Sequence, residues 1–291
     1  MGKLVLLGTG TPNAEFNASG PSYAIIVEDK VYLIDFGAGI VRQASKAYNQ
    51  GIKQLKPSNL NTAFLTHLHS DHTVGIADLI LTPWVLERKQ PLSIYGPKNT
   101  DDLIFYTLKA FKTDIQFRLN GMEKANDLGI IVNVKEVEND FIYKDNLVKV
   151  KAIKVTHGTL ESYAYKFYIK DKTILISGDT SINKNIEKEA INVDILVHEV
   201  EYEEGLKQRD LKWQKYHKSV HTLSSDLAKL CDLSKPKLLI TTHRIYHIDF
   251  YDDSLDVEKE IIKREELILE EIKNIYKGKV VNGHDLDVYE F

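Results

Sequence analysis

The chain has 291 residues, which is enough to bury a large core in one big domain or two small ones. Its hydrophobic content of 43% and charged content of 27% are ordinary for a soluble globular protein, and a formal net charge of -4 gives no overall positive field to attract nucleic acid. The single cysteine, Cys231, excludes an intramolecular disulfide. Because no apolar run approaches the ~18 residues of a membrane span, we expect a cytoplasmic protein.

The first part of the chain alternates short apolar runs with turns and helical patterns. We predict strands over residues 3–7, 23–27, 31–34 and 63–65, and helices over 40–48 and 74–86. Asp35 follows the third of these strands. It is a turn or cap residue, or it orients a metal-binding histidine from behind.

The segment Thr66-His67-Leu68-His69-Ser70-Asp71-His72 lies between a predicted strand and a predicted helix. His67 and His69 are two residues apart, so extended backbone points both side chains the same way. Asp71 and His72 then start the helix and face a second point nearby. Imidazoles crowded with a carboxylate suit zinc or another borderline divalent ion, and the split suggests two metals.

Further strands, hairpins and helices follow along the chain. Predicted strands are 92–95, 130–137, 148–155, 163–169, 173–176, 194–197, 237–240, 279–281 and 287–289. Predicted helices are 101–111, 183–190, 222–230 and 257–276, whereas 112–129 is irregular in pattern and 202–219 is polar. No linker divides the chain, so we expect a single α/β domain of two packed sheets with helices outside.

Histidine and aspartate recur where predicted strands end. Four different predicted strands are followed by His157, Asp179, His198 and His243. The segment Thr66–His72, called the histidine loop below, follows a further strand. Side chains that gather at the same ends of strands are typical of α/β sites. Five histidines with two aspartates would fill two metal sites.

This arrangement resembles the metallo-β-lactamase superfamily over nearly all 291 residues. The residues that carry the resemblance are His67-Leu68-His69-Ser70-Asp71-His72, His157, Asp179 in Ser-Gly-Asp-Thr, and His243. It implies a four-layer αββα sandwich with two mixed β-sheets, formed by one domain over residues 1–291. It also implies one metal on His67, His69 and His157, a second on Asp71, His72 and His243, and Asp179 as the bridge.

Within the superfamily the chain resembles the ribonuclease Z and arylsulfatase branch. The similar segments are residues 7–12, 20–22, 94–97 and 221–222, together with His198-Glu199, although Val200-Glu201 departs from the ribonuclease Z motif. Ribonuclease Z carries its tRNA-gripping arm between the equivalents of His157 and Asp179, and only 21 residues separate these two here. We therefore favour an arylsulfatase-like hydrolase of a sulfate or phosphate ester, also on softer similarities at residues 20–23, 79–84, 213–216 and 285–288. The alternatives are a ribonuclease Z-like phosphodiesterase or tRNA 3′ endonuclease, and a metal-binding sensor or scaffold without activity.

The resemblance implies a metal-bridging hydroxide as nucleophile, with two divalent ions, Zn²⁺ first and Mn²⁺ or Fe as alternatives. Asp71 would position the water or accept its proton, and His221 would protonate the leaving oxygen, oriented by Glu199. We expect His198 to be structural or to support a metal ligand from behind, and His217, His247 and His284 to be surface or local hydrogen-bonding groups. The expected substrate is a small ester, with nucleic acid less favoured, and a homodimer is an expectation from the resemblance alone.

Overall fold

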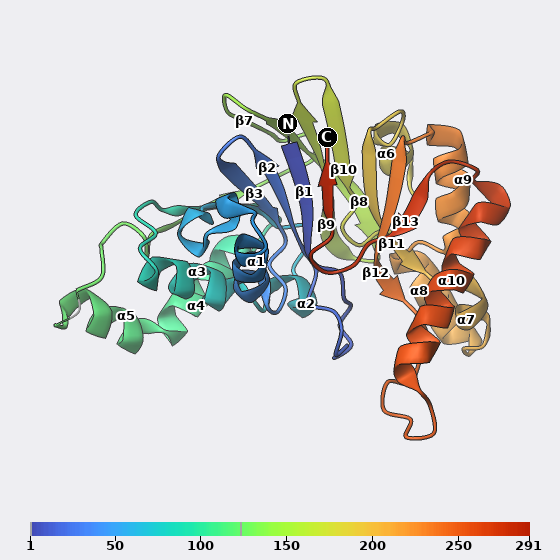
Figure 1. Ribbon diagram of the computed structural model, residues 1–291, viewed down its shortest axis with the longest axis horizontal. Coiled ribbons are helices and arrows are strands. Elements are labelled where there is room, and N and C mark those ends of the chain that lie inside the picture. The colour runs from blue at the N-terminus through green and yellow to red at the C-terminus, as the bar shows by residue number, and fades with distance from the viewer. Residues whose placement is uncertain (1, 123) are drawn as a thin grey trace. The chain divides into compact units, whose positions relative to one another are not determined.

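The computed structural model describes residues 2–122 and 124–291, which divide into two compact units. Unit 1 comprises Met1–Pro12, Phe16–Glu138 and His284–Phe291, and unit 2 comprises Asn13–Glu15 and Asn139–Gly283. Each unit contains one seven-stranded sheet with helices beside it (Figure 1). The expectation of one domain over residues 1–291 stays a prediction.

The sheet of unit 1 is mixed. Its strands lie in the order β14 (Val288–Glu290), β1 (Gly2–Gly8), β2 (Ser22–Val27), β3 (Lys30–Ile34), β4 (Thr62–Phe64), β5 (Leu92–Gly96) and β6 (Val132–Glu136). The first four are antiparallel neighbours, and β3 to β6 are parallel neighbours. The parallel half places the carboxyl ends of β3 and β4 side by side, and these ends carry Asp35 and the histidine loop.

Helices connect the parallel strands of unit 1. They are α1 (Ile40–Asn49), α2 (Ser70–Thr73), α3 (Ile76–Val85), α4 (Thr100–Ala110) and α5 (Lys112–Asn120), with two short 3-10 turns at Lys53–Leu55 and Pro57–Asn59. Apolar side chains of the sheet such as Ile26 and Leu33 pack with Ala44 of α1 and Leu79 of α3 in one buried cluster. This cluster fixes the helices on one face of the sheet and so holds the loop between β4 and α3.

Unit 2 repeats the same mixture of strand directions. Its sheet has the order β13 (Val280–Asn282), β12 (Leu238–Ile245), β11 (Ile195–Glu201), β10 (Lys172–Ile176), β9 (Leu160–Ile169), β8 (Lys149–His157) and β7 (Ile142–Lys144). Strands β7 to β10 are antiparallel neighbours, and β10 to β13 are parallel neighbours. The carboxyl ends of β10, β11 and β12 therefore lie next to one another, and each is followed by or contains a predicted site residue.

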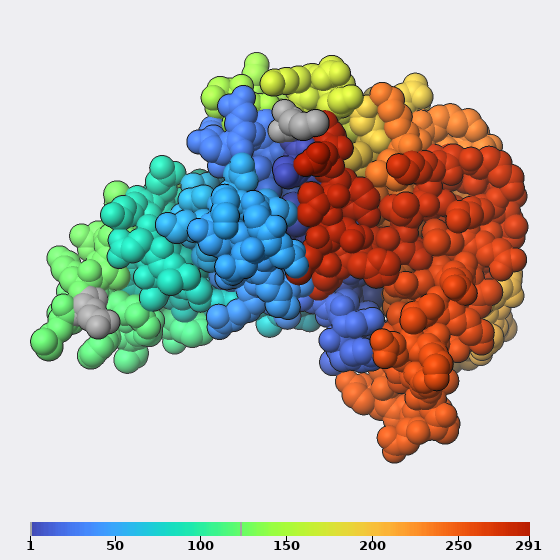
Figure 2. All heavy atoms as spheres, viewed as in Figure 1, coloured from blue at the N-terminus to red at the C-terminus, as the bar shows by residue number. Residues whose placement is uncertain are grey.

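The helices of unit 2 are α6 (Lys184–Glu189), α7 (Glu203–Lys207), α8 (Leu211–Val220), α9 (Ser224–Ser234) and α10 (Val257–Ile275). Val200 of β11 packs with Leu227 of α9 and Ile268 of α10, and Cys231 is buried in the same cluster. Burial raises the pKa of the Cys231 thiol, which keeps it protonated. Figure 2 shows α10, in orange and red, on the surface of unit 2, where its charged face is solvated.

The predicted fold class is confirmed: two mixed β-sheets are flanked by helices. The prediction of irregular structure over residues 112–129 is wrong at α5. This helix buries none of its residues, so it has no apolar stripe to reveal it, and Phe105, Phe111 and Phe117 of the α4–α5 segment are exposed. Within the described chain, the helices are all too short or too polar to cross a membrane.

Candidate functional site

The histidine loop of unit 1 brings four predicted ligands together. Nε2 of His67 lies 3.2 Å from Nδ1 of His69, and Nε2 of His72 lies 3.4 Å from Oδ2 of Asp71. The rings of His67 and His72 have centroids 4.1 Å apart. Asp71 and His72 lie in α2, so they begin a helix as predicted. Strand β4 ends at Phe64, so His67 and His69 lie beyond its end.

Asp35 supports this loop from behind. Of the two roles predicted for Asp35, the structure therefore favours orienting a histidine over a turn or cap role. Its Oδ2 lies 2.7 Å from Nδ1 of His72, its Oδ1 accepts from the backbone N–H of Thr66 at 2.7 Å, and both carboxylate and imidazole are buried. A carboxylate at Nδ1 holds the His72 ring so that Nε2 faces outward, which is the usual arrangement behind a metal-binding histidine. The loop approaches the 36–37 backbone so closely that a Cβ on Gly75 would lie 2.3 Å from the carbonyl oxygen of Gly37.

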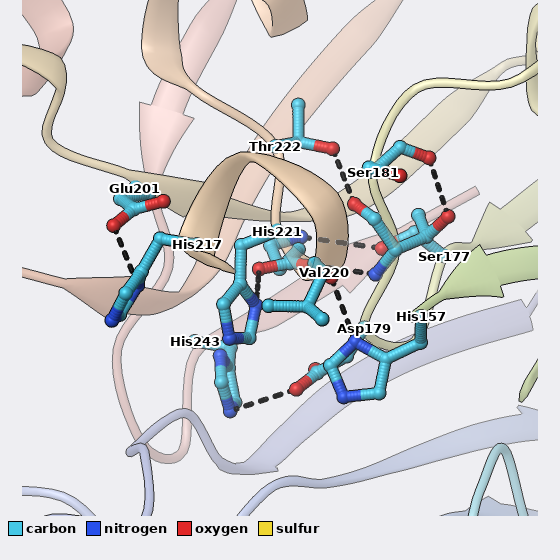
Figure 3. Close-up of polar contacts among 12 residues, drawn as sticks. His157, Ser177, Asp179, Ser181, Glu201, His217, Val220, His221, Thr222 and His243 are labelled. Carbon is cyan, nitrogen blue, oxygen red and sulfur yellow. Dashed lines mark hydrogen bonds and ion pairs between the residues drawn. The ribbon is translucent and has the colours of Figure 1, made fainter. Parts of the chain in front are cut away.

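Unit 2 brings the other three predicted ligands together at the ends of β8, β10 and β12. Nε2 of His243 lies 3.5 Å from Oδ2 of Asp179, and Nδ1 of His157 lies 2.7 Å from the carbonyl oxygen of Val220 (Figure 3). The bond to Val220 requires Nδ1 to carry the proton, so the lone pair of His157 is on Nε2. Burial lowers the pKa of His157, which favours the neutral imidazole that binds metals.

Glu199 and His221 form a carboxylate–histidine pair beside these ligands. Oε2 of Glu199 lies 2.7 Å from Nδ1 of His221, and Oε1 accepts from the backbone N–H of Thr180 at 2.5 Å. His221 is the C-cap of α8 rather than the start of a helix, and α9 begins at Ser224. Burial and the nearby Asp179 raise the pKa of Glu199.

The two roles expected for His198, structural or supporting a metal ligand from behind, stay predictions. His198 is fully buried, and its Nδ1 donates to the carbonyl oxygen of Glu199 at 2.8 Å. Burial lowers the pKa of His198 to about 4, so the imidazole is neutral at physiological pH.

A further cluster contains Glu201, His217 and His247. Oε1 of Glu201 lies 2.8 Å from Nδ1 of His217 and 2.7 Å from Nε2 of His247, and Glu201 has no exposed surface. The sequence predicted the two histidines to be surface or local hydrogen-bonding groups, and it indicated no partner for Glu201. The signal that could have revealed the pairing is the spacing: Glu199 and Glu201 are two apart on a strand, and His217 and His221 are four apart on a helix.

The donor distances test whether these residues fit divalent metal ions. Ligand atoms on a tetrahedral zinc, with bonds of about 2.0–2.1 Å, are roughly 3.3 Å from each other. The 3.2 Å His67–His69 distance, the 3.4 Å Asp71–His72 distance and the 3.5 Å Asp179–His243 distance all match this spacing. The contacts of Glu201 at 2.7 and 2.8 Å are shorter than this spacing. The contact with His247 is a hydrogen bond, and the contact with His217 is an ion-pair distance without hydrogen-bond geometry. Imidazole and carboxylate donors in both units thus suit a divalent ion.

The aromatic residues of segments 79–84 and 213–216 differ from one another in exposure. Trp84 is buried in α3, and its Nε1 donates to the carbonyl oxygen of Asn126 at 2.8 Å. Trp213 and Tyr216 lie on α8 with 45% and 50% of their surface exposed. His284 is exposed at the side chain, as predicted.

Comparisons with known proteins support this picture. The family model described as Anti-Pycsar protein Apyc1 matches residues 2–267. Ribonuclease Z of Mycobacterium avium (strain 104) is 29% identical over 202 residues, covering 68% of this chain and 70% of that protein. Ribonuclease Z of Mycobacterium marinum (strain ATCC BAA-535 / M) is 27% identical over 235 residues, covering 78% and 82%.

Solved structures show the same fold. The metallo-beta-lactamase fold protein YhfI from Bacillus subtilis has a TM-score of 0.70 at 18% identity, covering 100% of this chain and 99% of that one. Human tRNase Z, short form, has a TM-score of 0.70 at 21% identity, covering 99% and 98%. Zn(2+)-bound PqqB from Methylobacterium extorquens has a TM-score of 0.62 at 11% identity, covering 99% and 100%.

The chain thus combines histidine and aspartate sets suited to divalent metals with the metallo-β-lactamase fold and a relationship to ribonuclease Z. It is a metal-dependent hydrolase acting on ester bonds, and it belongs to the family described as Anti-Pycsar protein Apyc1.

Proposed function

We propose that this chain is a phosphodiesterase that hydrolyses a small phosphodiester with two Zn²⁺ ions. In this proposal, one ion takes His67, His69 and His157, as the superfamily resemblance implies. The other takes Asp71, His72 and His243, and Asp179 bridges them. When bound, such ions supply a nucleophile by lowering the pKa of a water and offset charge on the phosphoryl oxygens.

The observation that carries the proposal is the Glu199–His221 pair in unit 2. An alkoxide is a poor leaving group, so cleavage of an alkyl phosphodiester needs a proton donor at the leaving oxygen. His221 faces Asp179 and His243 closely enough for their donor atoms to lie within 4.8 Å of one another. With Nδ1 held by Glu199 at 2.7 Å, Nε2 is the atom that delivers the proton. Asp71 would assist on the side of the attacking water.

The β9–β10 hairpin favours a small substrate over tRNA. Ile169 pairs directly with Lys172, so only a tight turn separates the two strands. The interval in which ribonuclease Z would carry its tRNA-gripping arm is therefore filled by an ordinary hairpin. A formal net charge of -4 also gives no overall positive field to attract a polynucleotide.

The relatives favour a phosphate over a sulfate ester. From the sequence we favoured an arylsulfatase-like activity. The curated relatives, however, are named ribonuclease Z. The similar solved structures include a diphosphatase from the PhnP family, with a TM-score of 0.64 at 17% identity. These names support the phosphodiesterase alternative, and none of these matches supports the sulfatase preference.

A substrate panel tests the proposal. Metal-loaded protein would be assayed with bis(p-nitrophenyl) phosphate, a nucleoside cyclic monophosphate, p-nitrophenyl sulfate and a pre-tRNA. We expect hydrolysis of the small diesters and little or none of the sulfate or pre-tRNA. Faster cleavage of pre-tRNA than of any small diester would contradict the small-substrate assignment, and a preference for the sulfate would restore the arylsulfatase reading.

A further inference from the structure

Unit 2 contains two carboxylate–histidine pairs arranged side by side. Glu199 and Glu201 lie two residues apart on β11, while Val200 between them packs into the core formed with α9 and α10. His217 and His221 lie four residues apart along α8 and at its C-cap. Two residues of a strand advance roughly 6.6 Å and four residues of a helix roughly 6 Å, so the strand and the helix stay in register.

The two pairs resemble each other in distance, although only the contact of His221 with Glu199 has hydrogen-bond geometry; Figure 3 shows the contact between Glu201 and His217. Each uses Nδ1 of the histidine and a buried glutamate, at 2.7 Å in the Glu199–His221 pair and 2.8 Å in the Glu201–His217 pair. The ring centroids of His217 and His221 are 5.7 Å apart. The mechanism proposed above uses only the pair that contains His221.

His217 has the features of a fixed binding group. Its Nδ1 faces Glu201, which also contacts His247. Burial raises the pKa of Glu201, but the two imidazoles lower it by more, so the pKa lies below its ordinary value. Nε2 of His217, in contrast, has no polar partner among residues 2–122 and 124–291. A ring held at one nitrogen presents the other as a preoriented hydrogen-bonding group.

Exposed aromatic rings continue the row along the same face of α8. Trp213 precedes His217 by four residues, and their ring centroids are 5.8 Å apart. Tyr216 packs edge-on against Trp213 at 5.8 Å. Trp213, His217 and His221 thus form a line of rings that ends at the proposed proton donor.

We propose that Glu201, His217 and Trp213 form the subsite that binds the leaving group of the substrate, and that this leaving group carries an aromatic or heteroaromatic ring. The inference rests on the proposed function, because His221 must lie at the leaving oxygen. A group attached to that oxygen extends along α8 and meets His217 and then Trp213. Nε2 of His217 contacts a polar atom of this group, and the indole stacks on its ring.

Steady-state kinetics with two substrates test the subsite. Bis(p-nitrophenyl) phosphate has an aromatic ring on both sides of the phosphorus, whereas methyl p-nitrophenyl phosphate has one only on the leaving side. His217→Asn keeps a donor at the Nδ1 position for Glu201 but removes the ring and Nε2, and Trp213→Ala removes the indole. We expect each variant to raise KM about tenfold for both substrates while kcat stays within about twofold. The control Lys215→Ala, on the opposite face of α8, should leave both constants unchanged.

Three outcomes would overturn the inference. Unchanged KM in both variants would mean that the row of rings does not touch substrate. A raised KM for the bis-aryl substrate alone would place the subsite on the other side of the phosphorus. A fall in kcat together with a lower melting temperature in His217→Asn would assign the cluster a purely structural role.

A binding measurement separates this inference from the proposed function. Trp84 is buried and Trp213 is exposed, so acrylamide-sensitive fluorescence reports on Trp213. Phenyl phosphate should protect this signal from acrylamide more strongly than methyl phosphate, and His217→Asn should weaken the protection. Protection without turnover of any diester would refute the proposed function but support the subsite, whereas turnover without protection would do the reverse.

Discussion

Oδ2 of Asp35 lies 2.7 Å from Nδ1 of His72, and the same carboxylate accepts the backbone N–H of Thr66. One buried side chain at the end of β3 therefore fixes both the start of the histidine loop and the orientation of a predicted ligand.

Asp35→Ala should weaken metal binding without removing any ligand. Loss of such an orienting carboxylate typically costs about 10- to 100-fold in metal affinity. Competition with a chromophoric chelator measures the change, and Asp29→Ala, in the exposed β2–β3 turn, is the matched control. Equal affinities for wild type and Asp35→Ala would show that Asp35 only shapes the turn.

His221→Ala should lower kcat about 10²- to 10⁴-fold, because it removes the proton donor at the leaving oxygen. Glu199→Gln should have a smaller effect, since His221 remains but loses the carboxylate 2.7 Å from its Nδ1. Metal content by mass spectrometry should stay at the wild-type level in both variants. Loss of an ion from His221→Ala would identify His221 as a ligand instead.

His198 should make the protein less stable as the pH falls. Its pKa of about 4 in the folded protein lies below the ordinary value, so the unfolded chain binds the additional proton between these two values. The contribution is fully present above a pH of about 6.5 and declines toward pH 4, by roughly 3 kcal/mol in total. Urea unfolding of wild type and His198→Gln at several pH values isolates it, because the other titrating groups are common to both. Parallel pH dependences would contradict the assignment.

Arg88 should be a major source of stability in unit 1. Its guanidinium is fully buried and donates to the carbonyl oxygens of Leu60, Leu79, Ile80 and Gly129. Arg88→Ala leaves these acceptors unsatisfied and should lower the free energy of unfolding by about 4 kcal/mol. Denaturant unfolding measures this, with the exposed Arg42→Ala as control. A loss below about 1 kcal/mol would show that water replaces the guanidinium without cost.

The proximity of the residues in the histidine loop could be predicted from the sequence because local spacing determines it. His67 to His72 run from beyond the end of β4 into α2, so their proximity needs no knowledge of tertiary structure. The pairing of Glu201 with His217 depends instead on the register between β11 and α8, which the spacing of these residues does not fix on its own. Helix α5 was missed for a related reason, because an exposed helix without a buried face leaves no hydrophobic periodicity. The role of Asp35 could be predicted only in part. Its position at a strand end allowed a turn role or the orientation of a histidine, and only the contact with His72 distinguishes the two.

The most direct test of the central claim is the phosphodiesterase activity and metal content of Asp179→Ala beside wild type. Asp179 faces His243 in unit 2 and is the proposed bridge between the two ions. With bis(p-nitrophenyl) phosphate, wild-type protein should be active when loaded with Zn²⁺ and inactive after chelation. Asp179→Ala should lose activity on the order of 10³-fold and bind less metal. Wild-type turnover that survives chelation, or full activity with normal metal content in Asp179→Ala, would contradict a metal-dependent phosphodiesterase built on these residues.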